Sequence, residues 1–415
     1  MSQHVVVVGA GIIGTACAHY LQQAGWQVTV IDKGKPGEGC SHGNCGFVCP
    51  SHVLPLTTPE ALAKGFRSLF SRNSALSIPW RYDPTLWKWL WNFSRRCNRK
   101  NMIESAHGIA ALLKLSRDLY DDLLTKESID CEWQTRGLLF VFQSRAAMDH
   151  YAETDTLLRE TFSMPARRFD GDEVSQLEPA LKPGLAGGWL YESDAHLRPD
   201  KLMSSWQTLL RDRGVEFHFE CELRTIVRND THATSVSTNN GDITTDAVVI
   251  ATGAMTPLLK DELGCRIPIQ PGKGYSLTMP RPTPCPSYPL IFEEHSVAIT
   301  PWQSGYRIGS TMEFTGYDSS LSPKRLQFLR DGASHYLLQS ECEPILETWY
   351  GWRPMTYDSL PIIDFSPKYS NVLIVAGHNM LGLSMGPVTG LLAAEMLGRK
   401  KTSLDVGPYS LQRFR

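Results

Sequence analysis

The sequence has no long apolar run and no excess of charge of either sign, and each absence removes a class of protein. Since no stretch of about 18 or more apolar residues occurs, no segment is expected to cross a membrane as a helix. The chain has 41 Lys and Arg against 43 Asp and Glu, so its overall charge gives no reason to expect nucleic acid as a partner. We find no internal repeat and no low-complexity tract.

Cysteine is also sparse, with ten residues scattered over a chain of 415. No secretory segment is recognised before the glycine motif that starts at Gly9, so we expect reduced thiols and a cytoplasmic protein. Cys40, Cys45 and Cys49 are spaced C-x4-C-x3-C, a pattern reminiscent of iron–sulfur ligation. No fourth ligand is evident. We therefore predict no metal here and interpret these cysteines as small residues close to a cofactor.

The N-terminal segment reads as strand, glycine turn, helix and strand. The elements are expected at residues 4–8, 12–24 and 27–31, with Gly25 ending the helix. Gly9, Gly11 and Gly14 have the G-x-G-x-x-G spacing between the first strand and the helix. In this motif the first glycine allows the tight turn, the second allows the backbone to approach a pyrophosphate, and the third allows close packing.

An acidic residue completes the motif. Asp32 ends the second strand, 18 residues after Gly14, where a carboxylate can accept hydrogen bonds from ribose hydroxyls. Together these elements predict dinucleotide binding, and they leave NAD and FAD as the two options. A loop over residues 35–48 follows, with four glycines, a serine and an asparagine, and it suits a backbone that wraps around a large cofactor.

This loop resembles a segment of the D-amino-acid oxidase superfamily of flavoproteins, with matching positions Gly39, Ser41, Asn44 and Gly46. The resemblance recurs in order along the chain, at residues 246–259, 271–277, 306–318, 351–364 and 377–390. Within the superfamily, the sequence KGYSL and a Trp- and Arg-rich insertion near residues 80–100 are most similar to the bacterial D-amino acid dehydrogenase small-subunit type.

The resemblance implies a mixed α/β fold with a Rossmann-like FAD-binding domain. That domain is expected to take residues 1–50, 195–265 and 345–415. A discontinuous substrate-binding domain is expected to take residues 51–194 and 266–344, with an antiparallel sheet and inserted helices. Within it, the apolar spacing over residues 101–127 predicts a helix.

FAD is expected to bind without a covalent bond, because Pro354 stands near the position where monomeric sarcosine oxidases carry a flavin-linked cysteine. The cofactor contacts that the motif and the resemblance imply are Gly9, Gly11, Ile12, Ile13, Gly14, Asp32, Lys33, Ser41, Asn44, Cys45, Gly46, Leu223, Thr252, Gly253, Gly351, Asn379, Leu381, Gly382, Leu383 and Ser384.

Three side chains are candidates for substrate chemistry. Arg353, in the G-x-R-P segment, is predicted to bind a substrate carboxylate with its planar guanidinium. Tyr275 is a candidate hydroxyl near the substrate, with packing in the sheet as the alternative, and His52 is a second candidate. His378 is interpreted as a structural histidine rather than a base. Met380 stands where glycine-oxidase-like members carry an arginine, which favours a more apolar side-chain pocket.

The predicted activity is oxidation of a D-amino acid, D-proline and hydroxyproline included, with electrons passed to a quinone-type acceptor. A glycine- or sarcosine-type oxidase and a non-catalytic flavin subunit of an electron-transfer complex remain alternatives. Residues 64–100 hold nine Lys or Arg, one acid and four tryptophans, which fits either a membrane surface or a helical cap. The predicted location is therefore cytoplasmic, with peripheral contact to the inner membrane left open; no oligomeric state is predicted.

Overall fold

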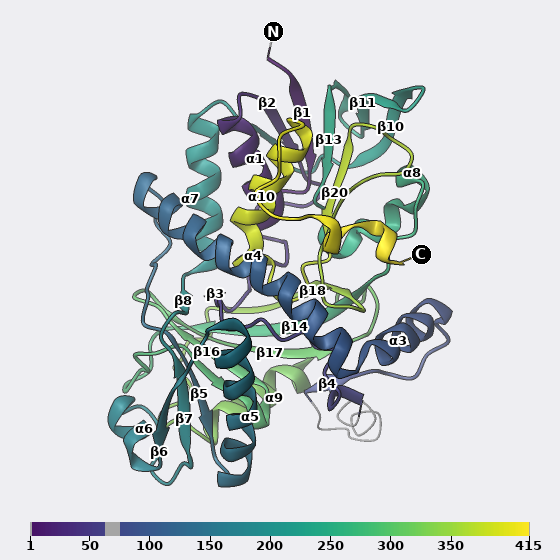
Figure 1. The fold of residues 1–415 in the computed structure, drawn as a ribbon. Helices are drawn as coiled ribbons and strands as arrows, with labels where there is room; N and C mark the ends of the chain where they lie inside the picture. The colour runs from purple at the N-terminus through teal and green to yellow at the C-terminus, as the bar shows by residue number, and fades with distance from the viewer. Residues whose placement is uncertain (1, 63–74, 415) are drawn as a thin grey trace.

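The computed structural model describes residues 2–62 and 75–414 and contains two large sheets, one above the other in the view of Figure 1. A six-stranded, mainly parallel sheet lies with helices α1 and α10, and a nine-stranded, mainly antiparallel sheet lies below it. The mixed α/β fold class is confirmed. Among the described helices, none has the length and apolar character needed to cross a bilayer.

The six-stranded sheet has its five parallel strands in the order β20, β13, β1, β2, β9, with β19 antiparallel at one edge. The bounds are β1 His4–Val8, β2 Gln27–Ile31, β9 Glu216–His218, β13 Ala247–Ile250, β19 Ile362–Phe365 and β20 Val372–Ala376. Alternate residues of β1 pack in opposite directions. Val5 and Val7 join α1 (Ile12–Gln23) and α10 (Gly382–Leu397) in one core, and Val6 and Val8 join a second core.

That second core is closed by a three-stranded antiparallel meander of β10 (Leu223–Asn229), β11 (His232–Thr238) and β12 (Gly241–Thr244). Both faces of the parallel sheet are therefore covered, which explains the continuous valine run of β1. The helix expected at residues 12–24 ends one residue earlier, and Gly25 follows it with a φ of +91°.

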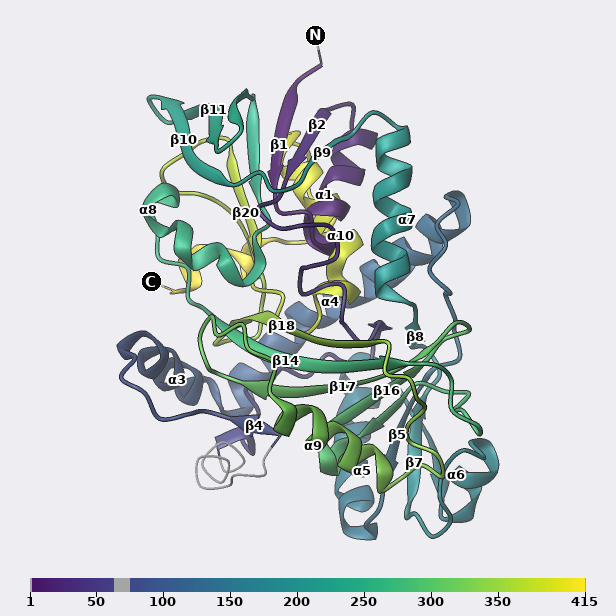
Figure 2. The same ribbon diagram turned by 180° about the vertical axis from the view of Figure 1, so that it is seen from behind.

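The nine-stranded sheet runs in the order β18, β14, β17, β16, β15, β5, β7, β6, and β4 pairs with β17. The bounds are β4 Leu76–Ser77, β5 Leu138–Phe142, β6 Arg167–Asp170, β7 Gly187–Tyr191, β14 Ile269–Met279, β15 Leu290–Phe292, β16 Val297–Pro301, β17 Tyr306–Glu313 and β18 Glu347–Thr356. Helix α9 (Pro323–Ser334) packs on the face turned away from the six-stranded sheet (Figure 2). The opposite face is therefore available to the cofactor-binding segments.

Further helices surround the sheets. Their bounds are α3 Pro84–Arg96, α4 Arg99–Lys126, α5 Arg145–Phe162, α6 Asp172–Leu177, α7 Pro199–Asp212 and α8 Lys260–Leu263. The helix expected at residues 101–127 is α4, which crosses in front of both sheets in Figure 1 and packs against α10. The Tyr120 hydroxyl of α4 donates to the Leu383 carbonyl of α10 at 2.7 Å, so the two helices are joined at the start of α10.

The strands of the two sheets come from different parts of the chain. All six strands of the first sheet lie within residues 1–50, 195–265 and 345–415. The second sheet takes its strands from residues 51–194 and 266–344, and it also includes β18, which falls in the range 345–415. The division into an FAD-binding and a substrate-binding domain stays a prediction; β18 physically links the two groups of segments.

Candidate functional site

The turn between β1 and α1 has room for glycine alone. Gly9 has a φ of +111°, and an added Cβ would lie 2.4 Å from the Ala251 carbonyl oxygen. A Cβ at Gly14 would lie 1.7 Å from the Gly9 oxygen. The helix cap, Gly11, offers no side chain to the first amides of α1. Ile12 and Ile13 form the buried first turn, so this helix start is a main-chain anion site of the kind that binds pyrophosphate.

Two polar side chains border this helix start. Asp32 Oδ2 accepts from the Ala10 amide at 2.7 Å, and its Oδ1 accepts from the Gly34 amide at 2.8 Å. Ser41 Oγ accepts from the Ile12 amide at 3.0 Å, which brings the 35–48 loop to the helix start. Lys33 follows Asp32 and is exposed. The predicted Asp32 and Ser41 are thus brought together at one end of α1.

The 35–48 segment, called the glycine-rich loop from here on, lies over the open face of the nine-stranded sheet. Ser276 Oγ of β14 donates to the Gly43 carbonyl at 3.0 Å, and Thr300 Oγ1 of β16 donates to the Cys45 carbonyl at 2.5 Å. A Cβ at Gly46 would lie 2.0 Å from the Leu197 oxygen. Within the loop, Asn44 Oδ1 accepts from the Gly46 amide at 2.8 Å. The predicted Asn44, Cys45 and Gly46 therefore shape the loop on this sheet.

Arg353 lies on the same sheet face. In the register of β14 and β18, Arg353 is opposite Gly272, and its guanidinium lies over Gly274, where an added Cβ would be 2.4 Å from Cζ. Its Nη1 donates to the Thr311 carbonyl at 2.6 Å, and burial lowers its pKa. Among the residues that the structure describes, Arg353 has no ion-pair partner. A partly buried guanidinium without a carboxylate partner is a site for an anionic ligand.

The backbone that orients Arg353 is strained. Thr311 has a φ of +57° and Ser310 a φ of +124°, at a bulge in the pairing of β14 with β17. A β-branched residue in the left-handed region costs about 1–3 kcal/mol and persists only where the surroundings require it. Here the bulge turns the Thr311 carbonyl toward the guanidinium of Arg353.

Trp349 is a site residue that sequence reasoning missed. It lies two residues before Gly351 on the same face of β18, and its ring fills the space above two glycines. A Cβ at Gly43 would lie 2.0 Å from the ring, and one at Gly351 would lie 2.2 Å from it. Gly351 pairs with Gly274 in the sheet. The Trp349 indole lies over Gly351 and the Arg353 guanidinium lies over Gly274, so the two side chains cover neighbouring positions. Gly43 and Gly351 were the available signal in the sequence, because a glycine at each position leaves room for the Trp349 ring.

The structure does not bring Tyr275 to this face. Tyr275 is opposite Tyr350, and strand alternation directs both to the side covered by α9. Its hydroxyl donates to Glu313 Oε2 at 2.7 Å, and Glu313 Oε1 is bound by Arg325 Nε at 2.6 Å. The alternative stated from the sequence, packing within the sheet, describes this environment, so Tyr275 is not part of the site we propose.

His52 is partly buried and belongs to a separate group with the buried Cys49 and Asp194. Its Nδ1 lies 3.4 Å from Ser51 Oγ, and Ser51 donates to Asp194 Oδ2 at 2.5 Å. Burial lowers the pKa of His52 to about 4 and raises that of Asp194 to about 7. Ligand atoms of Cys49, His52 and Asp194 gather within 4.8 Å. Among the described residues, this is the one group of three or more possible metal ligands that lie so close together. Cys40 and Cys45 are not part of it.

The segment before α10 closes over the glycine-rich loop. Ser384 Oγ donates to the Phe47 carbonyl at 2.9 Å, next to the loop end. Asn379 has a φ of +52° and accepts from the Thr356 amide at 3.0 Å. His378 contacts Thr389 Oγ1 at 3.0 Å, and burial lowers its pKa to about 3, so it is a neutral structural histidine at ordinary pH. Leu381, Gly382 and Leu383 form the helix start.

The remaining predicted contacts follow β13 or lie near it. Thr252 and Gly253 come directly after β13, where Gly253 has a φ of +53° and starts a 3-10 turn. Leu223 starts β10 and is 9% exposed in the core with Val6 and Val8. These positions surround the carboxyl ends of β1 and β13, where ligands of open parallel sheets bind.

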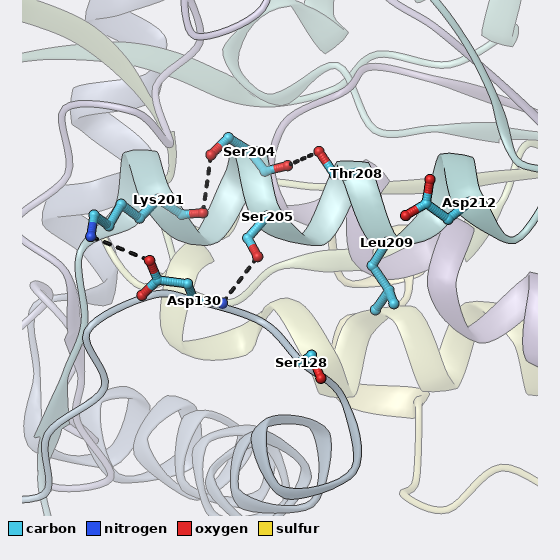
Figure 3. A pocket seen from close by; sticks show the side chains of 8 residues that line it. All are labelled: Ser128, Asp130, Lys201, Ser204, Ser205, Thr208, Leu209 and Asp212. Atoms are coloured by element: carbon cyan, nitrogen blue, oxygen red, sulfur yellow. Dashed lines mark hydrogen bonds and ion pairs between the residues drawn. The ribbon is translucent and has the colours of Figure 1, made fainter.

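A hollow of about 440 Å³ lies elsewhere, against α7 (Figure 3). It is lined by Ser128, Asp130, Lys201, Ser204, Ser205, Thr208, Leu209 and Asp212. Lys201 is paired with Asp130 at 3.3 Å, and the hollow contains none of the predicted site residues. We assign it no part in the site.

The fold, the glycine turn and the partly buried guanidinium without an ion-pair partner among the described residues indicate a dinucleotide-dependent oxidoreductase, and comparison with known proteins gives the family. The family model described as FAD dependent oxidoreductase matches residues 4–396, so the chain belongs to the FAD-dependent oxidoreductase family. The glycine cradle at α1 and the loop pinned to the sheet fit FAD as its cofactor.

Curated relatives and solved structures agree with this family. The D-amino acid dehydrogenases of Paramagnetospirillum magneticum and Granulibacter bethesdensis are each 30% identical, over 99% of this chain and 98% and 99% of theirs. Glycine oxidase from Geobacillus kaustophilus matches with a TM-score of 0.81 at 23% identity, over 99% of each chain. L-Proline dehydrogenase from P. horikoshii matches with a TM-score of 0.72 at 20% identity, over 100% of this chain and 99% of that chain.

Proposed function

We propose that this enzyme oxidises a D-amino acid, D-proline and hydroxyproline included, and passes the electrons to a quinone-type acceptor. The observation that carries the proposal is Arg353, a partly buried guanidinium with no carboxylate partner among the described residues, on the sheet face that holds the glycine-rich loop. The names of the two relatives at 30% identity support the D-amino acid as the substrate class.

The roles of the chain's own residues follow from this geometry. Arg353 holds the substrate carboxylate with its free N–H groups and so fixes the α carbon. Trp349 and the loop above it exclude water from the same face. FAD, when bound, would supply the hydride acceptor. Loss of a hydride and a proton converts the amino acid to an imino acid. For an acyclic amino acid, water then releases a 2-oxo acid and ammonia; for D-proline or hydroxyproline the product is a ring imine.

The first experiment is anaerobic bleaching of the flavin absorbance by D- and L-amino acids, glycine, sarcosine and hydroxyproline isomers. We expect rapid bleaching by D-amino acids alone. Bleaching by glycine or sarcosine with hydrogen peroxide formed in air would instead identify the oxidase alternative. Bound FAD that none of these compounds reduces would contradict the proposal and favour a non-catalytic flavin subunit.

FAD is proposed to be bound without a covalent bond. Pro354 follows Arg353 on β18, near the position at which some relatives of this superfamily carry a flavin-linked cysteine. Precipitation with trichloroacetic acid should therefore leave the yellow colour in the supernatant. A yellow pellet would overturn this part of the proposal.

We also propose a peripheral membrane contact through the described residues 75–100; the rest of the predicted stretch, residues 64–74, lies outside the described residues. Trp80 is 87% exposed, Tyr82 96% and Trp91 65%, and the basic residues Lys88, Arg95, Arg99 and Lys100 are exposed beside them. Exposed indoles with neighbouring cations suit an anionic lipid surface. Such contact would bring the enzyme to a quinone acceptor.

Vesicle flotation tests the contact. Changing Arg95, Arg96, Arg99 and Lys100 to Glu should release the protein from anionic vesicles. Changing the exposed Arg399, Lys400 and Lys401 to Glu is the matched control and should leave binding intact. Equal binding by parent and both variants would count against a membrane surface here.

A further inference from the structure

Arg307 is the second residue of β17, and it is only 1% exposed. Its Nη1 donates to two main-chain carbonyls of the glycine-rich loop, His42 O at 2.9 Å and Asn44 O at 2.8 Å. Its Nε donates to Thr278 Oγ1 at 2.9 Å, and its Nη2 lies 3.3 Å from Glu347 Oε2. All three guanidinium nitrogens are therefore engaged, two of them within the sheet and one with the loop.

The partners of Arg307 form one row across three strands. Thr278 of β14 lies directly opposite Arg307 of β17 and directly opposite Glu347 of β18. Glu347 Oε1 is also 2.8 Å from His42 Nε2, and this contact is the main cause that holds the pKa of Glu347 below its usual value. Arg307, Glu347 and His42 thus form a closed ring of polar contacts.

The same sheet face holds Arg353. The row of Thr278 and the row of Gly272, where Arg353 lies, are six residues apart along β14, or roughly 20 Å. Between them, Ser276 holds Gly43, and Gly274 lies beneath the Arg353 guanidinium. The loop and the substrate anchor are therefore placed relative to each other by one rigid sheet.

The burial of Arg307 needs a reason other than stability. Desolvation of a guanidinium is costly, and apolar residues of similar volume often stabilise a core as well or better. In Arg307, Nη1 donates to both loop carbonyls while Nε and Nη2 contact Thr278 and Glu347 in the sheet. Lysine has a single nitrogen and cannot reach the loop and both sheet partners at once, so this set of contacts requires the planar guanidinium of arginine.

We propose that Arg307 is a positioning residue for FAD: by holding the main chain at His42 and Asn44, it fixes the glycine-rich loop in the form that binds the cofactor. This inference rests on the FAD-binding part of the proposed function and not on the identity of the amino acid substrate. Sequence reasoning missed Arg307, because a single basic residue in a strand reads as an exposed position.

Arg307→Lys tests the proposal on the holoenzyme. FAD release on serial dilution is followed by the recovery of free flavin fluorescence, with no amino acid present. We expect the Kd for FAD to rise at least tenfold. Arg198→Lys is the matched control, because the Arg198 guanidinium lies over the same Trp302 ring, 5.5 Å away, but bonds Asp200 and Ser304 outside the loop. Its Kd should stay within twofold of the parent.

A second variant covers the case in which Arg307→Lys does not fold. Arg307 and His42 each contact a different oxygen of Glu347. Glu347→Gln leaves one oxygen acceptor for the two and removes the charge, and we expect at least a threefold rise in the Kd for FAD. Unchanged Kd in either folded variant overturns the proposal, and Arg307 is then a residue of the fold alone. Since FAD binding is measured without substrate, failure to oxidise D-amino acids would leave this result unaffected.

Discussion

At the scale of single residues, Arg353 carries a positive charge that no carboxylate among the described residues pairs with, and this charge is available to a ligand. Its carbonyl partner, Thr311, orients the guanidinium without neutralising it. Because the contact is to a neutral carbonyl, a substrate carboxylate gains a full charge-assisted pair on binding. The strained φ of Thr311 indicates that this orientation is maintained at a cost to the stability of the strand.

Arg353→Lys should raise KM for the amino acid roughly 10- to 100-fold, because a lost hydrogen bond to a charged group is worth about 1.5–3 kcal/mol. Steady-state kinetics with saturating acceptor measure this. Arg330→Lys is the control, since Arg330 is paired with Glu341 at the surface and should leave KM unchanged. Equal KM in parent and Arg353→Lys would remove Arg353 as the anchor.

For Tyr275, in contrast to Arg353, we expect substitution to change stability and to leave the kinetics nearly unchanged. Its hydroxyl lies with Glu313 and Arg325 on the α9 side of the sheet. Tyr275→Phe should therefore leave KM and kcat within about twofold while lowering the free energy of unfolding by about 1–3 kcal/mol, since Glu313 loses a buried donor. Urea denaturation and kinetics on the same preparation measure both. A large rise in KM with no loss of stability would place the hydroxyl at the substrate instead.

At the scale of elements, the glycine-rich loop depends on its fit to β18. Gly43→Ala would put a Cβ 2.0 Å from the Trp349 ring, so the loop or the ring must move. We expect a loss of about 1–3 kcal/mol in stability and weaker FAD retention. Thermal unfolding and flavin release report the two effects.

Two further variants distinguish this clash with Trp349 from a general sensitivity of the glycine-rich loop to substitution. At Gly39 an added Cβ meets nothing within 4 Å, so Gly39→Ala should leave the Tm unchanged. Combining Gly43→Ala with Trp349→Phe should restore part of the lost stability, because the smaller ring relieves the overlap. If Gly39→Ala is as destabilising as Gly43→Ala, the Trp349 contact is not the cause.

The same elements show what a sequence can and cannot predict. The strand, turn and helix around Gly9 were predictable because their signals are local: a valine run, glycine spacing and a helix end. The sides taken by Tyr275 and Arg353 were not, since they depend on the register between β14 and β18, strands about 80 residues apart in the chain. Trp349 and Arg307 were missed for the same reason, as their partners belong to a loop far away in sequence.

At the scale of the whole molecule, three buried histidines and the partly buried His52 govern stability in mild acid. Burial lowers the pKa of His19, His52 and His196 to about 4 and that of His378 to about 3, against 6.5 when unfolded. Between these values the unfolded chain binds more protons, so stability falls as pH drops below 6.5. Asp194, with its pKa raised to about 7, acts in the opposite direction over this range.

Burial also raises the pKa of Glu178. The four histidines outnumber these two carboxyls, so the net expectation is a loss of several kcal/mol between pH 7 and pH 4.5, since each pKa unit is worth about 1.4 kcal/mol. Urea denaturation at a series of pH values measures it. His196→Gln should make the pH dependence shallower, because its ring nitrogen only contacts the Pro301 carbonyl. Constant stability across this range would contradict the neutral, buried state of these histidines.

The central position of β1 in its sheet also determines when, during synthesis, the sheet can be completed and FAD can bind. β1 is made first, yet its neighbour β13 pairs Ala247 with Val5, and β20 and α10 come later still. At about 5–20 residues per second, the valine run waits roughly 10–50 s for β13 to be synthesised. Until then one edge of β1 lacks its strand partner, and the proposed FAD site lacks the residues after β13 and the start of α10. We therefore expect FAD to bind only after α10 has been made, so the yield of holoenzyme should depend on the flavin available to the folded chain.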